Sequence, residues 1–435
     1  MPHQLTDLEK TLFRSLVLWL LIATSQTYAQ GASPADPAFT LPEAAERVLQ
    51  QNPSLRSAQY ARQAAATRAE DAALTPQWSV GIELENVLGT GSLSGFDASE
   101  TTLSLARIFQ SRDKRDARLA AASAYGGDVA NELDAERLDL LALLAERFVD
   151  VVHRQERVRL ATESVEVWQA ARELAAARER AGAAPAADRL RTEIRVADAK
   201  LAAEGAEHEL HAARRLLAST WGSDTADFGR ADASLCRLHE LPPYEELAPR
   251  VADNPDLLRF ATEQRLREAE AHLAATRQRP DWRVSAGVRH LEGIGEQALV
   301  FGVSVPLGAA SRAAPAVKRA EAMGRESTLR REAAELEARA VLFDLYEEIR
   351  HTIRRVEVFD NEILPRARDI RNEIERGYSV GRFSHTALVN AQAELIAAAA
   401  ARIDACADNH RLLVSIERLT GGEPVMSSMN VEVSP

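Results

Sequence analysis

The longest proline-free stretch of this sequence restricts its fold most strongly. No proline occurs between Pro76 and Pro185, and residues 112–181 read as one helix. At 1.5 Å per residue such a helix would be roughly 105 Å long, which ordinary globular domains rarely contain. The pair Gly126-Gly127 offers the one place where we expect a bend or break. The pattern indicates a hollow or extended helical assembly.

Apolar side chains recur along this predicted helix at alternating spacings of three and four residues. Gln155 and Thr162 fill the two polar positions of the series. The spacing is typical of helices that pack nearly parallel to one another, as in coiled coils. The apolar members are Leu141, Leu144, Phe148, Val151, Val158 and Val165.

The chain contains one series of landmarks twice, about 200 residues apart. The repeated landmarks are Asn-Pro-x-Leu at 52–55 and 254–257, Trp78 and Trp282, Gly182 and Gly381, and the endings "LLASTWG" and "SIERLTG" at Gly222 and Gly421. This period is far longer than the 20–50 residues of solenoid repeats. Four landmarks in one order indicate an old duplication, so each half should contain a helix, two strands and two long helices joined by a glycine turn.

Two segments, "TPQWSVGIELENV" at 75–87 and "RPDWRVSAGVRHL" at 279–291, alternate with a period of two and share Pro-x-Trp. Strands of about ten residues, apolar outward and polar inward, are typical of membrane β-barrels. We therefore expect lipid-facing side chains at Trp78, Val80, Ile82, Leu84, Trp282, Val284, Phe301 and Val303. A soluble sandwich edge, or a small sheet covered by helices, is the alternative.

Four strands per chain are too few to close a barrel, since the smallest membrane barrels have eight. An open sheet edge in lipid would leave backbone groups unpaired, at several kcal/mol each. Other copies of the chain must therefore complete the sheet. Two copies give eight strands and a filled interior, whereas three give twelve strands and room for a channel.

The start of the chain has the order of a secretory signal peptide. Lys10 and Arg14 precede the apolar run 16–23, and Thr27-Tyr28-Ala29 ends in a small residue. We expect cleavage after Ala29. The apolar run is too short to span a bilayer as a helix, which makes an N-terminal anchor the weaker alternative.

These patterns divide the chain into a signal peptide (1–29), two repeats and a C-terminal tail (423–435). The first repeat, 30–238, has predicted strands at 77–88 and 101–109 and predicted helices at 112–181 and 186–221. The second, 239–422, has predicted strands at 282–291 and 298–307 and predicted helices at 313–376 and 384–420.

Composition and missing motifs exclude several classes of protein. The formal charge of −12 argues against a nucleic-acid partner. No P-loop, Cys-x-x-Cys pair or serine nucleophile elbow occurs, so we expect neither an enzyme nor a cofactor. His208 and His211 lie on one helical face without an evident third ligand, and we predict no metal site. Cys236 and Cys406 are far apart in sequence, and we expect two unpaired, packed thiols rather than a disulfide.

The glycine turns carry the strongest family likeness. The segments are "GYSVGRFSHTALVNAQAEL" at 377–395 and "RAGAAPAADRLRTEI" at 180–194, and the Asn-Pro-x-Leu openings and the "LTG" ending add to them. In these features the whole mature chain resembles the TolC-like outer-membrane efflux proteins, the exit ducts of tripartite RND-type pumps. The likeness is nearest to the branch that serves heavy-metal cation pumps.

The resemblance implies a mixed α/β membrane protein whose long antiparallel helices form an α-barrel. It implies a homotrimer with a twelve-stranded β-barrel in outer-membrane lipid and a helical tunnel through the periplasm. The implied partners are a periplasmic adaptor (membrane fusion) protein and an inner-membrane RND-type transporter, which delivers heavy-metal cations or drugs for passive export. The alternative is a periplasmic coiled-coil scaffold or adaptor with a small β domain, which would need no lipid-facing row of side chains.

The resemblance also implies a periplasmic gate near the two turns. By position, Tyr378 matches the constricting tyrosine and Asp188 an acidic gate residue, with Arg382 beside the family's basic position. Two further acidic positions of the family fall on Ala387 and Asn390, so a polar constriction replaces a fully charged gate.

The turns themselves fit helix hairpins. The glycines suit helix ends with positive φ, Ser384 can cap the next helix and Pro185 can open one. Tyr378, Arg382 and Phe383 are expected to be exposed together at one tip, which is typical of a partner contact. The predicted adaptor-contact residues are Gly182, Pro185, Gly377, Gly381, Phe383 and Ser384.

Overall fold

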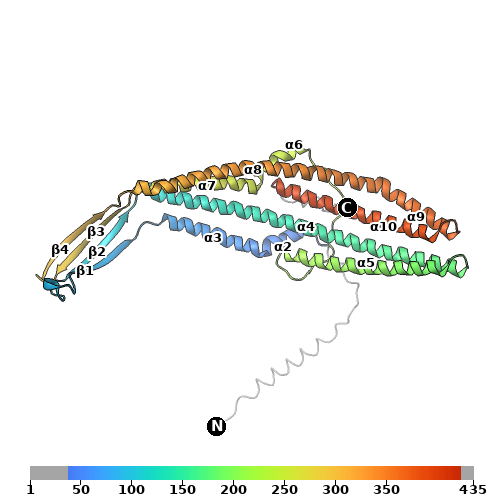
Figure 1. The fold of residues 1–435 in the computed structure, drawn as a ribbon, viewed down its shortest axis with the longest axis horizontal. Helices are drawn as coiled ribbons and strands as arrows, with labels where there is room; N and C mark the ends of the chain where they lie inside the picture. Colours follow the sequence, from blue (N-terminus) through green and yellow to red (C-terminus); the bar gives the residue numbers. More distant parts are fainter. Residues whose placement is uncertain (1–37, 423–435) are drawn as a thin grey trace, which may run out of the picture.

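The computed structural model describes residues 38–422, so the predicted signal peptide and C-terminal tail lie outside the described residues. The molecule is long and narrow, with a small sheet at one end and the tips of two helical hairpins at the other (Figure 1). None of the helices in this described range combines the length and the hydrophobicity needed to cross a bilayer.

The same order of elements occurs in both halves of the chain. The first half contains α2 (Leu41–Gln51), α3 (Pro53–Ala73), β1 (Trp78–Glu85), β2 (Glu100–Phe109), α4 (Arg112–Arg180) and α5 (Ala186–Ser219). The second contains α6 (Tyr244–Leu247), α7 (Pro255–Thr276), β3 (Trp282–Leu291), β4 (Glu296–Ser304), α8 (Ala309–Val358), α9 (Leu364–Ser379) and α10 (His385–Leu419). Short 3₁₀ turns lie at Gly91–Leu93 and Ala248–Asp253.

Helix α4 is continuous over 69 residues and passes through Gly126 and Gly127 without the expected bend or break. A glycine costs about 1 kcal/mol relative to alanine in a helix, which contacts along so long an element readily outweigh. Helix α4 packs against α3, α5, α7 and α10, and so joins both halves of the chain. Phe148 and Val151 of the predicted seam are fully buried, whereas Val158 and Val165 are half-buried.

The helix expected at 313–376 is divided. A π-helical turn, Phe359–Ile363, separates α8 from α9, and the N–H of Leu364 donates to the carbonyl of Phe359. Pro365 explains the turn, because proline has no N–H and its ring clashes with the carbonyl four residues earlier. The wider π turn accommodates the ring without ending the helix.

The four strands form one antiparallel sheet in the order β1-β2-β3-β4. Residues directly opposite in the register lie on the same face, and continuous apolar rows therefore cross the sheet. Two of these rows are Val80–Leu105–Ala286–Phe301 and Ile82–Leu103–Val288–Leu299. Strand β1 ends at Glu85 rather than at residue 88. Strand β4 ends at Ser304 rather than at residue 307, because Pro306 has no N–H to donate to the sheet.

All eight side chains predicted to face lipid lie on this apolar face and are exposed. Their exposed fractions run from 39% for Val284 to 76% for Ile82 and Phe301. No helix within residues 38–422 covers this face (Figure 1). The covered-sheet alternative is therefore wrong for this face.

The two repeated Asn-Pro motifs are equivalent contacts between helix ends. In the first half the motif joins the start of α3 to the end of α5, and in the second half it joins the start of α7 to the end of α10. Asn52 accepts hydrogen bonds from the first N–H groups of α3, and its side-chain amide donates to the carbonyl of Thr220 at 2.7 Å. Asn254 caps α7 in the same way and donates to the carbonyls of Arg418 and Leu419 at 2.9 and 2.8 Å. Gly421 lies close to this cap, since a Cβ there would be 3.1 Å from the carbonyl of Asp253. The repeated landmarks thus mark two equivalent joints in the middle of the molecule.

The largest core lies around these joints, where α2, α4, the end of α5 and α10 meet. Val48, Phe148, Leu217 and Cys406 are fully buried in it. A second core joins α7 and α8 to the end of α10 and contains Leu342. The packing therefore concentrates in the middle of a long molecule.

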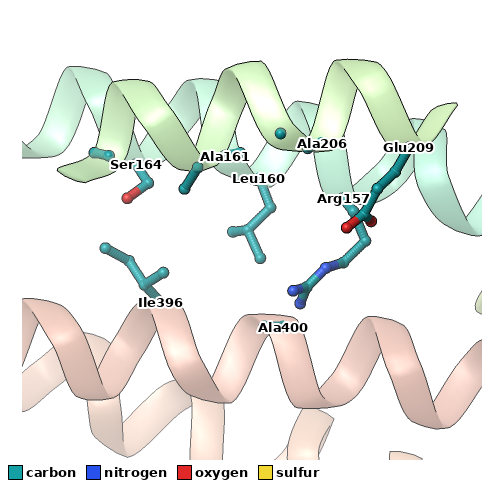
Figure 2. A pocket seen from close by; sticks show the side chains of 11 residues that line it. Arg157, Leu160, Ala161, Ser164, Ala206, Glu209, Ile396 and Ala400 are labelled. Carbon is teal, nitrogen blue, oxygen red and sulfur yellow. The ribbon is translucent and has the colours of Figure 1, made fainter. Parts of the chain in front are cut away.

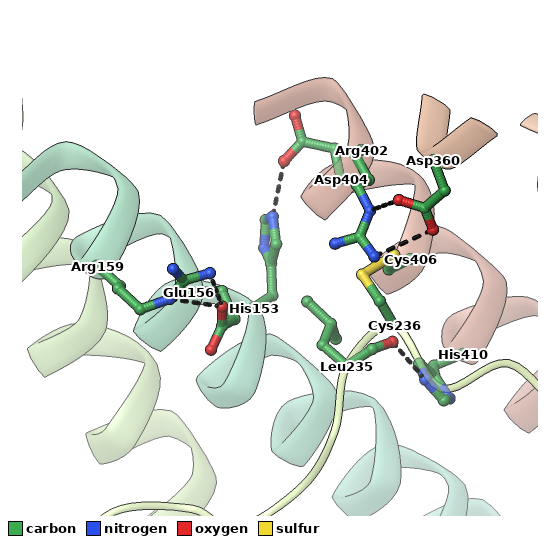
Figure 3. Close-up of a disulfide and its surroundings, with 10 residues drawn as sticks. All are labelled: His153, Glu156, Arg159, Leu235, Cys236, Asp360, Arg402, Asp404, Cys406 and His410. Atoms are coloured by element: carbon green, nitrogen blue, oxygen red, sulfur yellow. Dashed lines mark hydrogen bonds and ion pairs between the residues drawn. A yellow bond between two sulfur atoms is a disulfide. The ribbon is translucent and has the colours of Figure 1, made fainter. Parts of the chain in front are cut away.

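Cys236 and Cys406 form a disulfide, so the expectation of two unpaired thiols is wrong (Figure 3). The segment that follows α5 folds back across α10 and brings the two Cα atoms to 5.1 Å. Beside the disulfide, the buried His410 ring lies 2.8 Å from the carbonyl of Leu235. Arg402 of α10 pairs with Asp360 in the π turn. The middle of α10 is thus held to both neighbouring segments.

Candidate functional site

The two hairpin turns lie together at the end of the molecule opposite the sheet (Figure 1). Gly182 and Gly381 have φ angles of 68° and 83°, which only glycine adopts without strain, as predicted. The Ser384 hydroxyl accepts the N–H of Ala387 at 3.2 Å and caps α10, and Pro185 is the N-cap of α5. These local roles match the sequence-based expectation.

Gly377 serves a different purpose from the one expected. It lies inside α9 with an ordinary helical backbone, so positive φ is not its requirement. Instead, a Cβ at this position would lie 2.3 Å from the Phe383 ring. Gly377 lets that half-buried ring fold back onto α9 and close the turn.

Tyr378 is buried, with 2% of its surface exposed, so the expectation of an exposed tyrosine is wrong. The Arg178 guanidinium lies over its ring, 4.6 Å from the centroid, and also donates to its carbonyl. Arg178 comes from the last turn of α4 and donates to the carbonyl of Ala183 at 3.1 Å. One guanidinium therefore joins both hairpin turns.

Sequence reasoning missed Arg178, as it missed His385 and Thr192. The only local signal of Arg178 is a basic side chain in the last turn of a helix, which is common because it interacts favourably with the helix dipole. Arg382, which the sequence favoured, is exposed on the turn, and its backbone N–H donates to the carbonyl of Gly377 at 2.7 Å. Arg178, not Arg382, occupies the position beside the Tyr378 ring.

A second contact between the hairpins lies beside Tyr378. The His385 ring of α10 is 5% exposed, and its Nε2 lies 2.7 Å from the hydroxyl of Thr192 on α5. Its Nδ1 lies 3.9 Å from a carboxylate oxygen of Asp188. The ring centroids of His385 and Tyr378 are 6.0 Å apart. Asp188 and Tyr378, both predicted gate residues, thus meet around His385.

Burial and the nearby charges shift two pKa values in this group. Burial, with a smaller contribution from the Asp188 carboxylate, raises the pKa of Tyr378, so its phenol stays neutral at physiological pH. Burial lowers the pKa of His385, and Asp188 opposes this effect only in part. The Tyr378 hydroxyl is buried without a hydrogen-bond partner in the described part of the chain. An unpaired buried hydroxyl is costly and favours rearrangement once a partner becomes accessible.

Above the tips, the hairpins share one small apolar cluster and then separate. The cluster joins Trp168 and Val196 of the first hairpin to Val389 and Ile396 of α10. Beyond it lies a cleft of about 330 Å³ between α4, α5 and α10 (Figure 2). Its lining residues are Arg157, Leu160, Ala161, Ser164, Ala199, Ala202, Gly205, Ala206, Glu209, Ile396 and Ala400.

At the opposite end of the molecule, the polar face of the sheet holds a charge cluster. Arg289 lies 2.8 Å from Glu85 and 2.7 Å from Glu100, and its Nε donates to Thr102 at 3.0 Å. Glu85 is therefore neutralised by a partner, whereas Glu83 remains exposed on the same face. The described residues contain no cluster of three or more His, Cys, Asp or Glu side chains placed to hold a metal ion.

Aromatic side chains mark the helix-side edge of the apolar face. Trp282 pairs with Phe109 across β2 and β3, and Trp78 stands opposite Arg107 on β1 and β2. The Arg107 guanidinium lies 5.2 Å from the Trp78 ring and 5.8 Å from the Phe109 ring. Aromatic and basic side chains of this kind are enriched at membrane–water interfaces.

The exposed apolar sheet and the two long hairpins together give this chain the fold of the TolC-like outer-membrane channels. The sequence is 25% identical over 312 residues to the cobalt-zinc-cadmium resistance protein CzcC of Cupriavidus metallidurans, covering 71% of this chain and 74% of that protein. The structure of CusC matches with a TM-score of 0.76 at 15% identity, covering 91% of this chain and 96% of that one. The open state of the Neisseria gonorrhoeae MtrE outer-membrane channel matches with a TM-score of 0.72 at 18% identity, covering 91% and 92%.

No protein-family model matches the chain. The resemblance to TolC-like outer-membrane efflux proteins is nevertheless confirmed, because the curated relative is a heavy-metal resistance protein and the matching structures share the fold over about nine-tenths of the chain. The mixed fold of long antiparallel helices and a four-stranded sheet is confirmed as well.

Proposed function

We propose that this chain is the outer-membrane exit duct of a tripartite efflux system. Three copies pair their sheets edge to edge into one twelve-stranded barrel, and their hairpins form a tunnel through the periplasm. The substrate passes through passively and is selected by the inner-membrane transporter. The similarity to a cobalt-zinc-cadmium resistance protein supports heavy-metal cations as the cargo.

One observation carries this proposal. All four strands place apolar side chains on one uncovered face, while the outer edges of β1 and β4 have no partner within the described chain. An exposed apolar face with open edges is unfavourable in water, and open edges are unfavourable in lipid. Pairing with further copies in a membrane removes both costs. A periplasmic scaffold or adaptor would leave this face unexplained.

We further propose that the hairpin tips close the periplasmic end of the duct. Tyr378 and Asp188 act there with Arg178, and Arg382 remains available to a partner. The exposed tip residues Gly182, Pro185, Gly381 and Ser384 form the surface for the periplasmic adaptor. Gly377 and Phe383 support that surface by shaping the second turn.

Cell fractionation and gel electrophoresis test the proposed duct. The protein should sediment with outer membranes and migrate as a trimer in detergent before heating and as a monomer afterwards. Reconstituted into planar bilayers, the trimer should produce discrete conductance steps. Recovery as a soluble periplasmic monomer would overturn the proposal.

A further inference from the structure

His385 is a buried titratable side chain of α10 that contacts α5 of the other hairpin at the tips. We propose that it is an acid-released latch, which holds the hairpins together while its ring is neutral and lets them separate when it is protonated. Opening of the duct by this separation rests on the proposed function above. The separation of the hairpins does not, and it can be measured by itself.

The hydrogen bonds indicate which form of the ring fits this position. The Thr192 hydroxyl donates its single proton to the carbonyl of Asp188 at 2.8 Å. The Nε2 of His385, 2.7 Å away, must then donate to the Thr192 oxygen, which leaves Nδ1 of the neutral ring without a proton. Nδ1 lies 3.9 Å from the Asp188 carboxylate, too far for a hydrogen bond. A proton on Nδ1 would therefore have no hydrogen-bond acceptor within reach among the described residues.

The charges around the ring also oppose a second positive group. Asp188 on α5 faces the ring, but Arg191 on the same helix lies 4.0 Å from that carboxylate and shares its charge. Arg178 on α4 reaches the neighbouring Tyr378, whose own phenol is neutral. Asp188 therefore favours a charged His385 ring, whereas Arg191 opposes it. Burial, with a smaller effect of Arg191, accordingly lowers the pKa of His385 below its ordinary value of 6.5, although Asp188 acts in the opposite direction.

The sign of the pH dependence follows from linkage. In separated hairpins the His385 ring would be in water, with a pKa near its ordinary value of about 6.5. The docked form has the lower pKa and binds the proton less strongly. Docking is therefore fully favourable above about pH 6.5 and weakens as the pH falls toward the docked pKa, by up to about tenfold per pH unit.

The architecture allows the tips to move as a unit. The middle of α10 is fixed by the disulfide and by the Arg402–Asp360 ion pair. Between this anchor and the tips, the two hairpins are separated by the cleft, whose walls carry mainly small side chains from α5 (Figure 2). On the tip side of this cleft the hairpins meet at the Trp168 cluster and at the tips, and on the anchor side Asp404 of α10 pairs with His153 and Arg157 of α4.

Spin labels at the exposed positions Ala183 and Val380 report the distance between the tips in the full-length protein in detergent. Between pH 7.5 and pH 5.0 the wild-type distance distribution should shift toward a longer distance. His385→Gln keeps a donor for Thr192 but cannot be protonated, and should hold the short distance throughout. His208→Gln, which changes an exposed histidine of α5, should behave like the wild type.

A wild-type distance that does not change with pH would overturn the latch, as would an equal acid response in His385→Gln. If His385→Gln does not fold, the same measurement on Asp188→Asn tests the latch. This variant removes the one charge that favours protonation, so the acid-driven separation should become larger, and an unchanged or smaller response would overturn the proposal. Acid-dependent separation without any bilayer conductance would refute the duct while leaving the latch intact.

Discussion

Replacing Arg178 with leucine should loosen the hairpin tips more than any other single change at this site. The guanidinium donates to carbonyls on both turns and lies over the Tyr378 ring. The half-buried hydrogen bonds and the ring contact of Arg178 together contribute on the order of 2 kcal/mol to the free energy of docking of the two hairpin tips. A loss of this size would shift the ratio of docked to separated tips by about 30-fold. Leucine retains apolar contact with the ring but supplies no donor.

The same pair of spin labels and the conductance of the reconstituted trimer measure this effect at pH 7.5. In Arg178→Leu the longer tip distance should become populated, and the channel should spend more time in conducting states. Arg180→Leu is the matched control, because Arg180 is exposed and donates only to Ala176 in its own helix. Equal behaviour of the two variants would refute the assignment of Arg178 as the inter-hairpin link.

Three further predictions concern the sheet, the disulfide and the second turn. Ile82→Lys places a charge on the apolar face and should cost about 2–4 kcal/mol in membrane assembly, whereas Glu83→Lys on the polar face should still yield trimer on an unheated gel. Cys236→Ser removes a disulfide that joins residues 170 apart and should lower unfolding stability by about 2–4 kcal/mol in denaturant titration; an unchanged midpoint would contradict this. In Gly377→Ala the new Cβ should clash with Phe383, lower the free energy of unfolding by about 1–3 kcal/mol and speed hydrogen exchange at that turn. Gly205→Ala is the control, because a Cβ there meets no atom within 4 Å, and it should show neither effect.

The sequence was most informative where a local pattern is repeated or periodic. Strand β3 has the same first and last residues, Trp282 and Leu291, as the strand predicted from the sequence. Strict alternation and a preceding proline define such a strand locally. The repeated Asn-Pro motif indicated a duplication, although only the structure showed that Asn52 and Asn254 join helix ends more than 160 residues away. Short-range patterns specify helices and strands, but they do not specify which ends meet.

The tip of the molecule shows why the candidate site was only partly predictable. Tyr378 and Asp188 were identified by likeness of position to a family, and the structure brings both of them to His385. The burial of Tyr378 and the role of Arg178 depend on how two hairpins about 200 residues apart pack together. No local pattern encodes that packing, since an arginine in the last turn of a helix is equally suited to solvent.

By itself, the sequence determined the long helices, the paired strands with one apolar face, the turns and the duplicated order, because each depends on residues close together in the chain. Only the tertiary structure decided the disulfide between Cys236 and Cys406, the uncovered position of the sheet and the contacts around His385. These depend on the direction in which long, stiff elements leave their joints. A small change of direction at a joint moves a helix tip by many ångströms, and no pattern along the chain records it.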